Sequence, residues 1–310
     1  MKIIFMGSTE GSLFCLKELC RRGFDIAAVV TQTDKPAGRG MKVSAPPVKA
    51  YAAENNIPVF QPETLKDDAL VSQLAALSPD LIVVVAYGKI LPESVLKLPP
   101  KGCINLHASL LPKYRGAAPV NWAIINGEKE TGITTQLMVK KLDAGDILMQ
   151  EKETITENDT TGTLLEKLII KGAILLADTV KLWDERKINP VPQDESLVTF
   201  SPIMKKEDGK IDWNKNANDI VNLVRGTNPW PGAYTELGLE TGEKLKIWMA
   251  VSAQIDIAGE PGKISIDKER LFVKASSGAV ELIEVQPENK RRMIVSEYLR
   301  GYKLPARFNS

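Results

Sequence analysis

Apolar residues occur in short continuous runs along the first third of the chain, and stretches with helical spacing separate the runs. Residues 2–6, 26–30, 81–85 and 103–107 are runs of the kind that strands show when both faces of their sheet are covered. Between the first two runs, the apolar positions of residues 13–20 recur at helical spacing. This alternation predicts an α/β fold, with a Rossmann-like, mostly parallel sheet and flanking helices.

A different pattern begins at residues 131–139, where apolar and polar side chains alternate. A short turn containing Asp143 and Asp146 follows, and residues 147–154 form the next candidate strand. Alternation with a short turn predicts an antiparallel edge on the sheet. Residues 163–183 then show the apolar periodicity of one long amphipathic helix that packs against the sheet.

The pattern changes again after a proline-rich polar stretch. We expect residues 1–189 to form the α/β domain, residues 190–204 a linker, and residues 205–310 a second domain. The second domain contains several short apolar runs spaced by turns, a pattern typical of a small all-β, OB-like barrel.

Composition limits the partners and the cellular compartment that we expect for the protein. The chain has 310 residues and a formal net charge of +1, so contacts with a polyanion would have to come from local basic patches. Its three cysteines have no metal-type spacing, which favours a reducing, cytoplasmic compartment. We find neither a signal peptide at the N-terminus nor an apolar run long enough to cross a membrane. Nothing requires a dimer, and we expect a monomer.

The candidate chemistry centres on His107, the only histidine in the chain. Asn105 lies two residues earlier on the same predicted strand, so both side chains point to one face. Polar side chains at a strand end that opens into a loop are typical of α/β active sites. A purely structural histidine is the alternative. One histidine and no Cys/His cluster leave no metal site to expect.

Two basic regions are candidates for binding a phosphate backbone. The first is the long loop after the second strand, which carries Lys35, Arg39 and Lys42 and contains two glycines that favour flexibility. The second is the run of basic residues at positions 290–292 in the predicted barrel. In both cases the alternative is a solvated charged surface without a partner.

The turn after the first strand resembles a dinucleotide-binding loop only superficially. It reads Gly7-Ser8-Thr9-Glu10-Gly11, which is not the Gly-x-Gly-x-x-Gly fingerprint. Glu10 would also place a carboxylate where a pyrophosphate should lie. A nicotinamide cofactor is therefore the weakest of the alternatives.

Several motifs together carry a family resemblance. They are Asn105-x-His107-x-Ser109-Leu110-Leu111-Pro112-x-x-Arg115-Gly116, Leu142-Asp143-Ala144-Gly145-Asp146, Gly38-Arg39-Gly40, Asn228-Pro229-Trp230-Pro231-Gly232-Ala233, and Gln286-Pro287 ahead of Lys290-Arg291-Arg292. With them the chain resembles the formyltetrahydrofolate-dependent transferases over nearly its whole length. The resemblance implies that the formyl group of 10-formyltetrahydrofolate moves to the α-amino group of methionine on initiator methionyl-tRNA, giving N-formylmethionyl-tRNA for translation initiation.

The resemblance also implies roles for particular residues. The catalytic residues would be Asn105, His107 and Asp143. The residues expected to bind folate are Ser109, Leu110, Leu111, Pro112, Tyr87 and Gly88. The residues expected to bind tRNA are Lys35, Arg39, Lys42, Lys290, Arg291 and Arg292. Two alternatives stay open: a transferase of the same fold that formylates a small amine, and a nucleic-acid-binding module without catalysis.

Overall fold

The computed structural model describes residues 1–37, 42–237 and 243–309. Contacts divide the chain into two compact units, and each unit is made of several separate segments of the sequence. The first unit comprises residues 1–116, 131–153 and 165–200, and the second comprises residues 117–130, 154–164 and 201–310.

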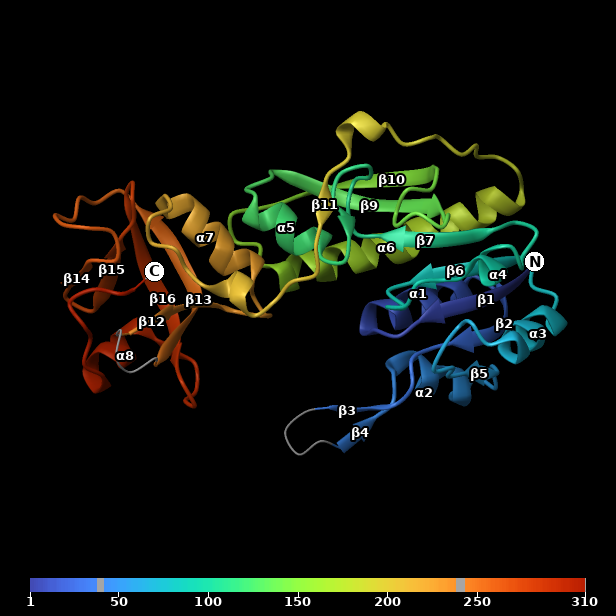
Figure 1. Ribbon diagram of the computed structural model, residues 1–310, viewed down its shortest axis with the longest axis horizontal. Helices are drawn as coiled ribbons and strands as arrows, with labels where there is room; N and C mark the ends of the chain where they lie inside the picture. Colours follow the sequence, from blue (N-terminus) through green and yellow to red (C-terminus); the bar gives the residue numbers. More distant parts are fainter. Residues whose placement is uncertain (38–41, 238–242, 310) are drawn as a thin grey trace. The chain divides into compact units, whose positions relative to one another are not determined.

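The first unit contains a seven-stranded sheet with the strand order β10-β9-β7-β6-β1-β2-β5 (Figure 1). The strands from β7 to β5 run parallel to their neighbours, and β9 runs antiparallel to β7. They are β1 (Lys2–Gly7), β2 (Asp25–Val30), β5 (Val59–Phe60), β6 (Leu81–Val85), β7 (Cys103–His107), β9 (Glu130–Leu137) and β10 (Ile147–Thr154). The predicted Rossmann-like α/β fold is therefore confirmed.

Apolar side chains are buried on both faces of this sheet, because successive strand residues point to opposite sides. Ile3 and Phe5 of β1 belong to one buried cluster, and Ile4 and Met6 belong to the other. Each such side chain contributes about 1.5–3 kcal/mol when it is fully buried. The helices around the sheet are α1 (Glu10–Arg21), α2 (Pro47–Glu54), α3 (Asp68–Ala76), α4 (Glu93–Leu96) and α6 (Thr161–Asp184).

The carboxyl ends of β6 and β7 lie side by side, which positions the candidate site. Val84 of β6 is in register with Asn105 of β7. The end of β7 at His107 therefore lies beside the turn that follows β6, where Tyr87 and Gly88 are found. Loops that leave adjacent parallel strands at this edge are where α/β folds bind ligands.

The loop after β2 differs from the irregular stretch that the sequence predicts. It contains two short strands, β3 (Lys35–Ala37) and β4 (Lys42–Ser44), which pair antiparallel. Their ladder gives the backbone at the base of the loop hydrogen-bond partners, which a purely irregular loop would need to find in water. Arg39 lies outside the described residues.

The second unit contains an antiparallel sheet with the order β12-β13-β16-β15-β14, and β17 pairs with β16 (Figure 1). The strands are β12 (Ala233–Glu236), β13 (Lys244–Ala253), β14 (Ile264–Asp267), β15 (Arg270–Lys274), β16 (Ala279–Pro287) and β17 (Met293–Ile294). The C-terminal residues join the two edges, since Arg307 bridges to Lys263 and Asn309 bridges to Glu236. These bridges cover the open edges, as in a small barrel.

The helices of the second unit include one from the middle of the predicted α/β domain. Among the described residues of this unit lie α5 (Pro119–Ile125), α7 (Ala217–Gly226) and α8 (Val295–Gly301). The remaining short elements of the molecule are β8 (Arg115–Gly116), β11 (Phe200–Ser201) and the 3-10 turns Glu195–Leu197 and Glu207–Gly209. Asn121 donates from its side chain to the carbonyl of Gly226 at 2.8 Å. A Cβ on Gly226 would lie 2.5 Å from Ile125, so the glycine permits α5 and α7 to pack closely.

Candidate active site

Asn105 and His107 lie on the same face of β7, where they meet polar side chains of β9. In the antiparallel register, Asn105 is opposite Gln136 and His107 is opposite Thr134. Directly opposed side chains on one face have Cβ atoms about 4.5–5.5 Å apart. The Asn105 carboxamide is half-buried and has no hydrogen-bond partner in the part of the chain that the structure describes. It is therefore available to a bound ligand.

The imidazole of His107 is buried, with only 6% of the residue exposed. Its Nε2 lies 2.9 Å from the carbonyl oxygen of Tyr114. A carbonyl only accepts hydrogen bonds, so this contact places a hydrogen on Nε2. The other nitrogen, Nδ1, lies 3.7 Å from Oδ2 of Asp143. The ring thus lies between a backbone carbonyl, to which it is hydrogen-bonded, and a carboxylate.

Asp143 lies in the turn between β9 and β10 with a positive φ of 47°. Its Oδ2 accepts a hydrogen bond from the backbone N–H of Gly116, and its Oδ1 accepts one from Nε2 of Gln136, both at 3.0 Å. Charge-assisted hydrogen bonds of this kind fix the direction of a carboxylate. The structure therefore brings together the three residues that were predicted to be catalytic.

These side chains can carry out acyl-transfer chemistry as a group. The amide N–H of Asn105, which no described residue engages, can donate to an oxygen on which negative charge develops. The carboxylate of Asp143 can orient the imidazole of His107 and stabilise a positive charge on it, or accept a proton through water. The three side chains supply a donor, a proton-transfer group and a fixed negative charge.

The segment that follows His107 is held by hydrogen bonds within the chain. The Ser109 hydroxyl is fully buried and donates to the carbonyl of Lys113 at 2.6 Å. The N–H of Leu111 donates to the hydroxyl oxygen of Thr134, and its carbonyl accepts from Gln150. Ser109 and Leu111 therefore stabilise the conformation of the loop through hydrogen bonds within the protein.

Leu110 and Pro112 are the members of this segment that keep accessible surface. Both are half-buried, whereas Ser109 and Leu111 are buried. Of the residues expected to bind folate in this segment, these two could meet a ligand with their side chains.

In the turn after β6, the backbone is accessible to a ligand and the aromatic ring of Tyr87 is not. Tyr87 is 1% exposed, its ring is part of the core, and burial raises the pKa of its hydroxyl to about 12. Its carbonyl accepts a hydrogen bond from Gln32. Gly88 is exposed with a φ of 79°, a conformation that other residues rarely adopt. A ligand beside this turn would approach Gly88.

The basic loop is described only in part. Lys35 is exposed, and its Nζ donates to Oε1 of Gln32 at 2.6 Å. Lys42 belongs to β4. Arg39 is not among the residues that the structure describes, so the position of its side chain stays a prediction.

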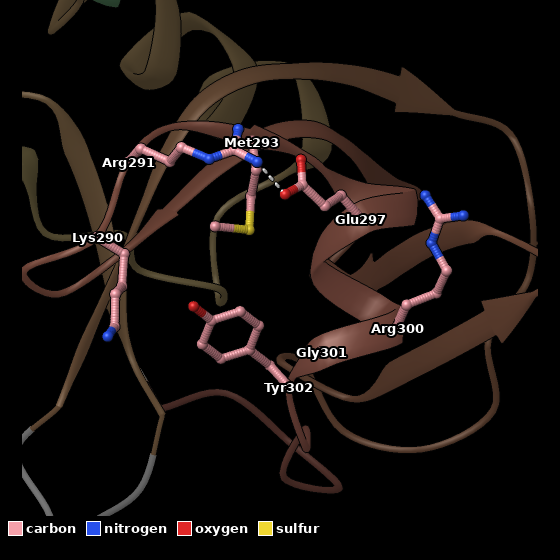
Figure 2. Close-up of a pocket in the computed structure, with 7 residues that line it drawn as sticks. All are labelled: Lys290, Arg291, Met293, Glu297, Arg300, Gly301 and Tyr302. Carbon is pink, nitrogen blue, oxygen red and sulfur yellow. Dashed lines mark hydrogen bonds and ion pairs between the residues drawn. The ribbon is translucent and has the colours of Figure 1, made fainter.

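The basic residues before β17 take two different directions. Lys290 and Arg291 line a hollow of about 480 Å³ in the second unit (Figure 2). Its other lining residues are Met293, Glu297, Arg300, Gly301 and Tyr302. Arg291 forms an ion pair with Glu297 across the hollow. Arg292 instead stacks on Trp248, with its guanidinium 3.5 Å from a ring centroid.

Three residues that contribute to the site were not recognised as site residues from sequence. Gln136 bonds the carboxylate of Asp143, Gln193 bonds the backbone of the Asp143 turn, and Arg115 bonds Gln193. A signal existed for Gln136, a polar residue within an alternating strand next to the predicted site. Gln193 lies in the predicted linker, about fifty residues from the turn that it contacts, and no local pattern indicates such a contact.

Within the described residues, no three or more His, Cys, Asp and Glu side chains are grouped so that they could hold a metal ion. The helices described also include none whose length and apolar character would suit a membrane span.

Comparison with known protein families gives two matches that together cover most of the chain. Residues 1–180 match the formyl transferase family, and residues 203–303 match the formyl transferase C-terminal domain. Methionyl-tRNA formyltransferase of Caldanaerobacter subterraneus is 49% identical over 306 residues, 98% of each chain. The enzyme of the same name from Alkaliphilus oremlandii is 47% identical over 302 residues, 97% of this chain and 96% of that one.

Solved structures show the same fold at lower identity. An N-formyltransferase from Helicobacter canadensis, in complex with folinic acid and dTDP-3-aminofucose, superposes with a TM-score of 0.69 at 18% identity over 93% of this chain and 99% of that one. HypX from Aquifex aeolicus in complex with tetrahydrofolic acid gives 0.64 at 18% identity, over 98% of this chain and 48% of that one. The matches in sequence, their coverage and the shared fold lead to one conclusion: this chain belongs to the formyl transferase family and, within it, to the methionyl-tRNA formyltransferases.

Proposed function

We propose that this protein transfers the formyl group of 10-formyltetrahydrofolate to the α-amino group of methionine on initiator methionyl-tRNA. The observation that carries the proposal is the geometry at the end of β7. There the imidazole of His107 lies 3.7 Å from the fixed carboxylate of Asp143. The same strand face presents the carboxamide of Asn105, for which the described residues offer no hydrogen-bond partner. The near full-length identity to methionyl-tRNA formyltransferases supports the choice of acceptor.

Each residue of the site has a role in this reaction. The neutral amine attacks the formyl carbon, and negative charge develops on the formyl oxygen as the new C–N bond forms. Asn105 donates a hydrogen bond to that oxygen. Asp143 holds His107 in place, and the pair accepts the proton that the amine loses and returns one to the departing nitrogen.

The folate co-substrate would supply the formyl group and its leaving nitrogen. The residues at the strand ends fit a flat ring system. Gly88 exposes backbone without a side chain, and a Cβ there would lie 2.5 Å from the Gln32 side chain, which bonds the carbonyl of Tyr87. Leu110 and Pro112 offer partly exposed apolar surface. We therefore expect these residues to bind the folate, and Tyr87 to contribute its backbone.

The acceptor would be held by basic residues in both parts of the chain. In the loop after β2, Arg39 would contact the acceptor end, with support from Lys35 and Lys42. Lys290, Arg291 and Arg300 line the hollow against one acid, Glu297 (Figure 2). We expect this excess of positive charge to attract a phosphate group of the tRNA. We propose that residues 1–189 carry the chemistry, residues 205–310 bind tRNA, and residues 190–204 connect them.

The test is formylation of charged initiator tRNA by purified protein with 10-formyltetrahydrofolate. We expect acid-stable formylmethionine on the tRNA. Arg39→Ala should slow this transfer far more than it weakens folate binding, because its proposed contact is with the tRNA. If a substrate that a known formyltransferase accepts stays unformylated, the proposal fails. If only a small free amine is formylated, the acceptor is a small molecule and not tRNA.

A further inference from the structure

Gln193 points into the site from a segment whose side chains are mostly exposed. The segment of residues 191–200 follows α6. Val191 pairs with Ile147, at the start of β10, through two backbone hydrogen bonds of 2.8 Å. This pairing brings Gln193 to the turn between β9 and β10. Gln193 is half-buried, whereas Val191 and Asp194 are exposed.

The Gln193 carboxamide uses all of its hydrogen-bonding capacity. Its Nε2 donates to the backbone carbonyls of Asp143 and Gly145, at 2.8 and 2.7 Å. Its Oε1 accepts from Nε and Nη2 of Arg115, at 3.0 and 2.8 Å. Two donors and two lone pairs are therefore engaged. The side chain fixes the backbone on both sides of Ala144.

Arg115 connects this contact to the carboxylate of Asp143. It is fully buried, and its Nη2 forms an ion pair with Glu195 at 2.8 Å. Arg115 immediately precedes Gly116, whose N–H donates to Oδ2 of Asp143. Asp143 is thus held through its main chain by Gln193 and through its side chain by Gly116, and Arg115 joins the two supports.

We infer that Gln193 is a positioning residue for catalysis, which acts by holding Asp143 in the orientation that faces His107. The inference rests on the proposed function. Asp143 has a positive φ of 47°, which aspartate adopts less readily than glycine, so hydrogen bonds to the main chain help to hold this turn. The two hydrogen bonds from Gln193 supply that support on the main chain, and without them the carboxylate loses its direction toward Nδ1.

Two substitutions of similar size separate the functions of the Gln193 side chain. Gln193→Met removes the donors and the acceptor. Gln193→Glu keeps the acceptor for Arg115 but faces the carbonyls of Asp143 and Gly145 with a carboxylate oxygen. We expect both variants to lower kcat about 10- to 100-fold, because a misplacement of about 1 Å costs on that scale. KM for tRNA and for folate should change less than about threefold.

A double-mutant cycle shows whether Gln193 acts through Asp143. In an Asp143→Asn background, Gln193→Met should cost less than about twofold further, because the group that it positions is already impaired. A residue that only stabilises the fold would act independently of Asp143, so the two rate losses would multiply in the double variant. Single-turnover rates that show this full product would therefore overturn the positioning role.

The matched control is Ser196→Ala in the same segment, whose hydroxyl bonds Asp194. It should keep the wild-type kcat. Circular dichroism and thermal unfolding verify that each variant is folded, and Gln193→Glu retains the Arg115 contact if the methionine variant is unstable. An inactive wild-type protein would refute the proposed function. An active wild type with unchanged kcat in both Gln193 variants would refute the inference alone.

Discussion

The chemistry of the site depends on which side chains already have hydrogen-bond partners within the protein. Gln136, Gly116 and Gln193 hold Asp143 from three directions, whereas the described residues provide no partner for the carboxamide of Asn105. A fixed carboxylate beside a free donor is the combination that an acyl-transfer site requires, since donors that are already placed need no reorganisation during the reaction.

Replacement of Asn105 tests this difference. Asn105→Asp is isosteric but puts a carboxylate where a donor is needed, so it repels the charge that develops on the formyl oxygen. We expect kcat to fall about 10²–10³-fold. Circular dichroism should show that the variant is folded, because Asn105 makes no hydrogen bond within the described residues. A variant with normal kcat would show that Asn105 does not contact the reacting oxygen.

At the scale of elements, the turn between β9 and β10 is built against the neighbouring backbone. A Cβ on Gly145 would lie 1.5 Å from the carbonyl oxygen of Leu137, and that oxygen belongs to a strand that cannot move easily. The N–H of Leu137 in turn donates to the carbonyl of Asp146 at 2.9 Å. The turn therefore packs closely against the end of β9. This packing places Asp143 beside β7.

Gly145→Ala should consequently displace the turn together with Asp143. We expect a destabilisation on the order of 2 kcal/mol, which lowers Tm by about 4–8 °C, and a loss in kcat of about 10²-fold from the misplaced carboxylate. Differential scanning calorimetry and the formylation assay measure the two effects. Ala144→Ser, which adds one atom at the neighbouring position, is the control and should change neither. Wild-type Tm and kcat in Gly145→Ala would contradict the contact.

At the scale of the whole molecule, the chain crosses between its two units more than once. Residues 117–130 and 154–164 group by contacts with the second unit, although the sequence assigns them to the first domain. The reason is visible at α5, where Asn121 bonds Gly226 and Ile125 packs against the same glycine. The first unit in turn extends to residue 200 and includes the Gln193 contact.

Truncation should distinguish the predicted boundary from the observed contacts. A fragment of residues 1–189 lacks Gln193 and Glu195, the hydrogen-bond and ion-pair partners of the Arg115 guanidinium, and also lacks the pairing of Val191 with Ile147. We expect it to be less stable in urea than a fragment of residues 1–203. Both should be less stable than the full chain, because α5 loses α7. Equal urea midpoints for the two fragments would show that residues 190–203 do not stabilise the first unit.

Local patterns in the sequence were sufficient for the main strands of the first sheet, the long helix and the shared face of Asn105 and His107, because the periods of strands and helices involve only neighbouring residues. They did not predict the short strands β3 and β4. The alternation of elements also determined the α/β fold and the small β domain. The motifs supplied Asp143, but its support is tertiary. Gln193 reaches Asp143 from a distant segment, and the ring of Tyr87 turns into the core although it follows a strand end. Arg292 stacks on Trp248 while Lys290 lines a hollow. Which segments return to a site, and which way a side chain points there, depends on packing between residues far apart in the chain, and only the folded structure decides it.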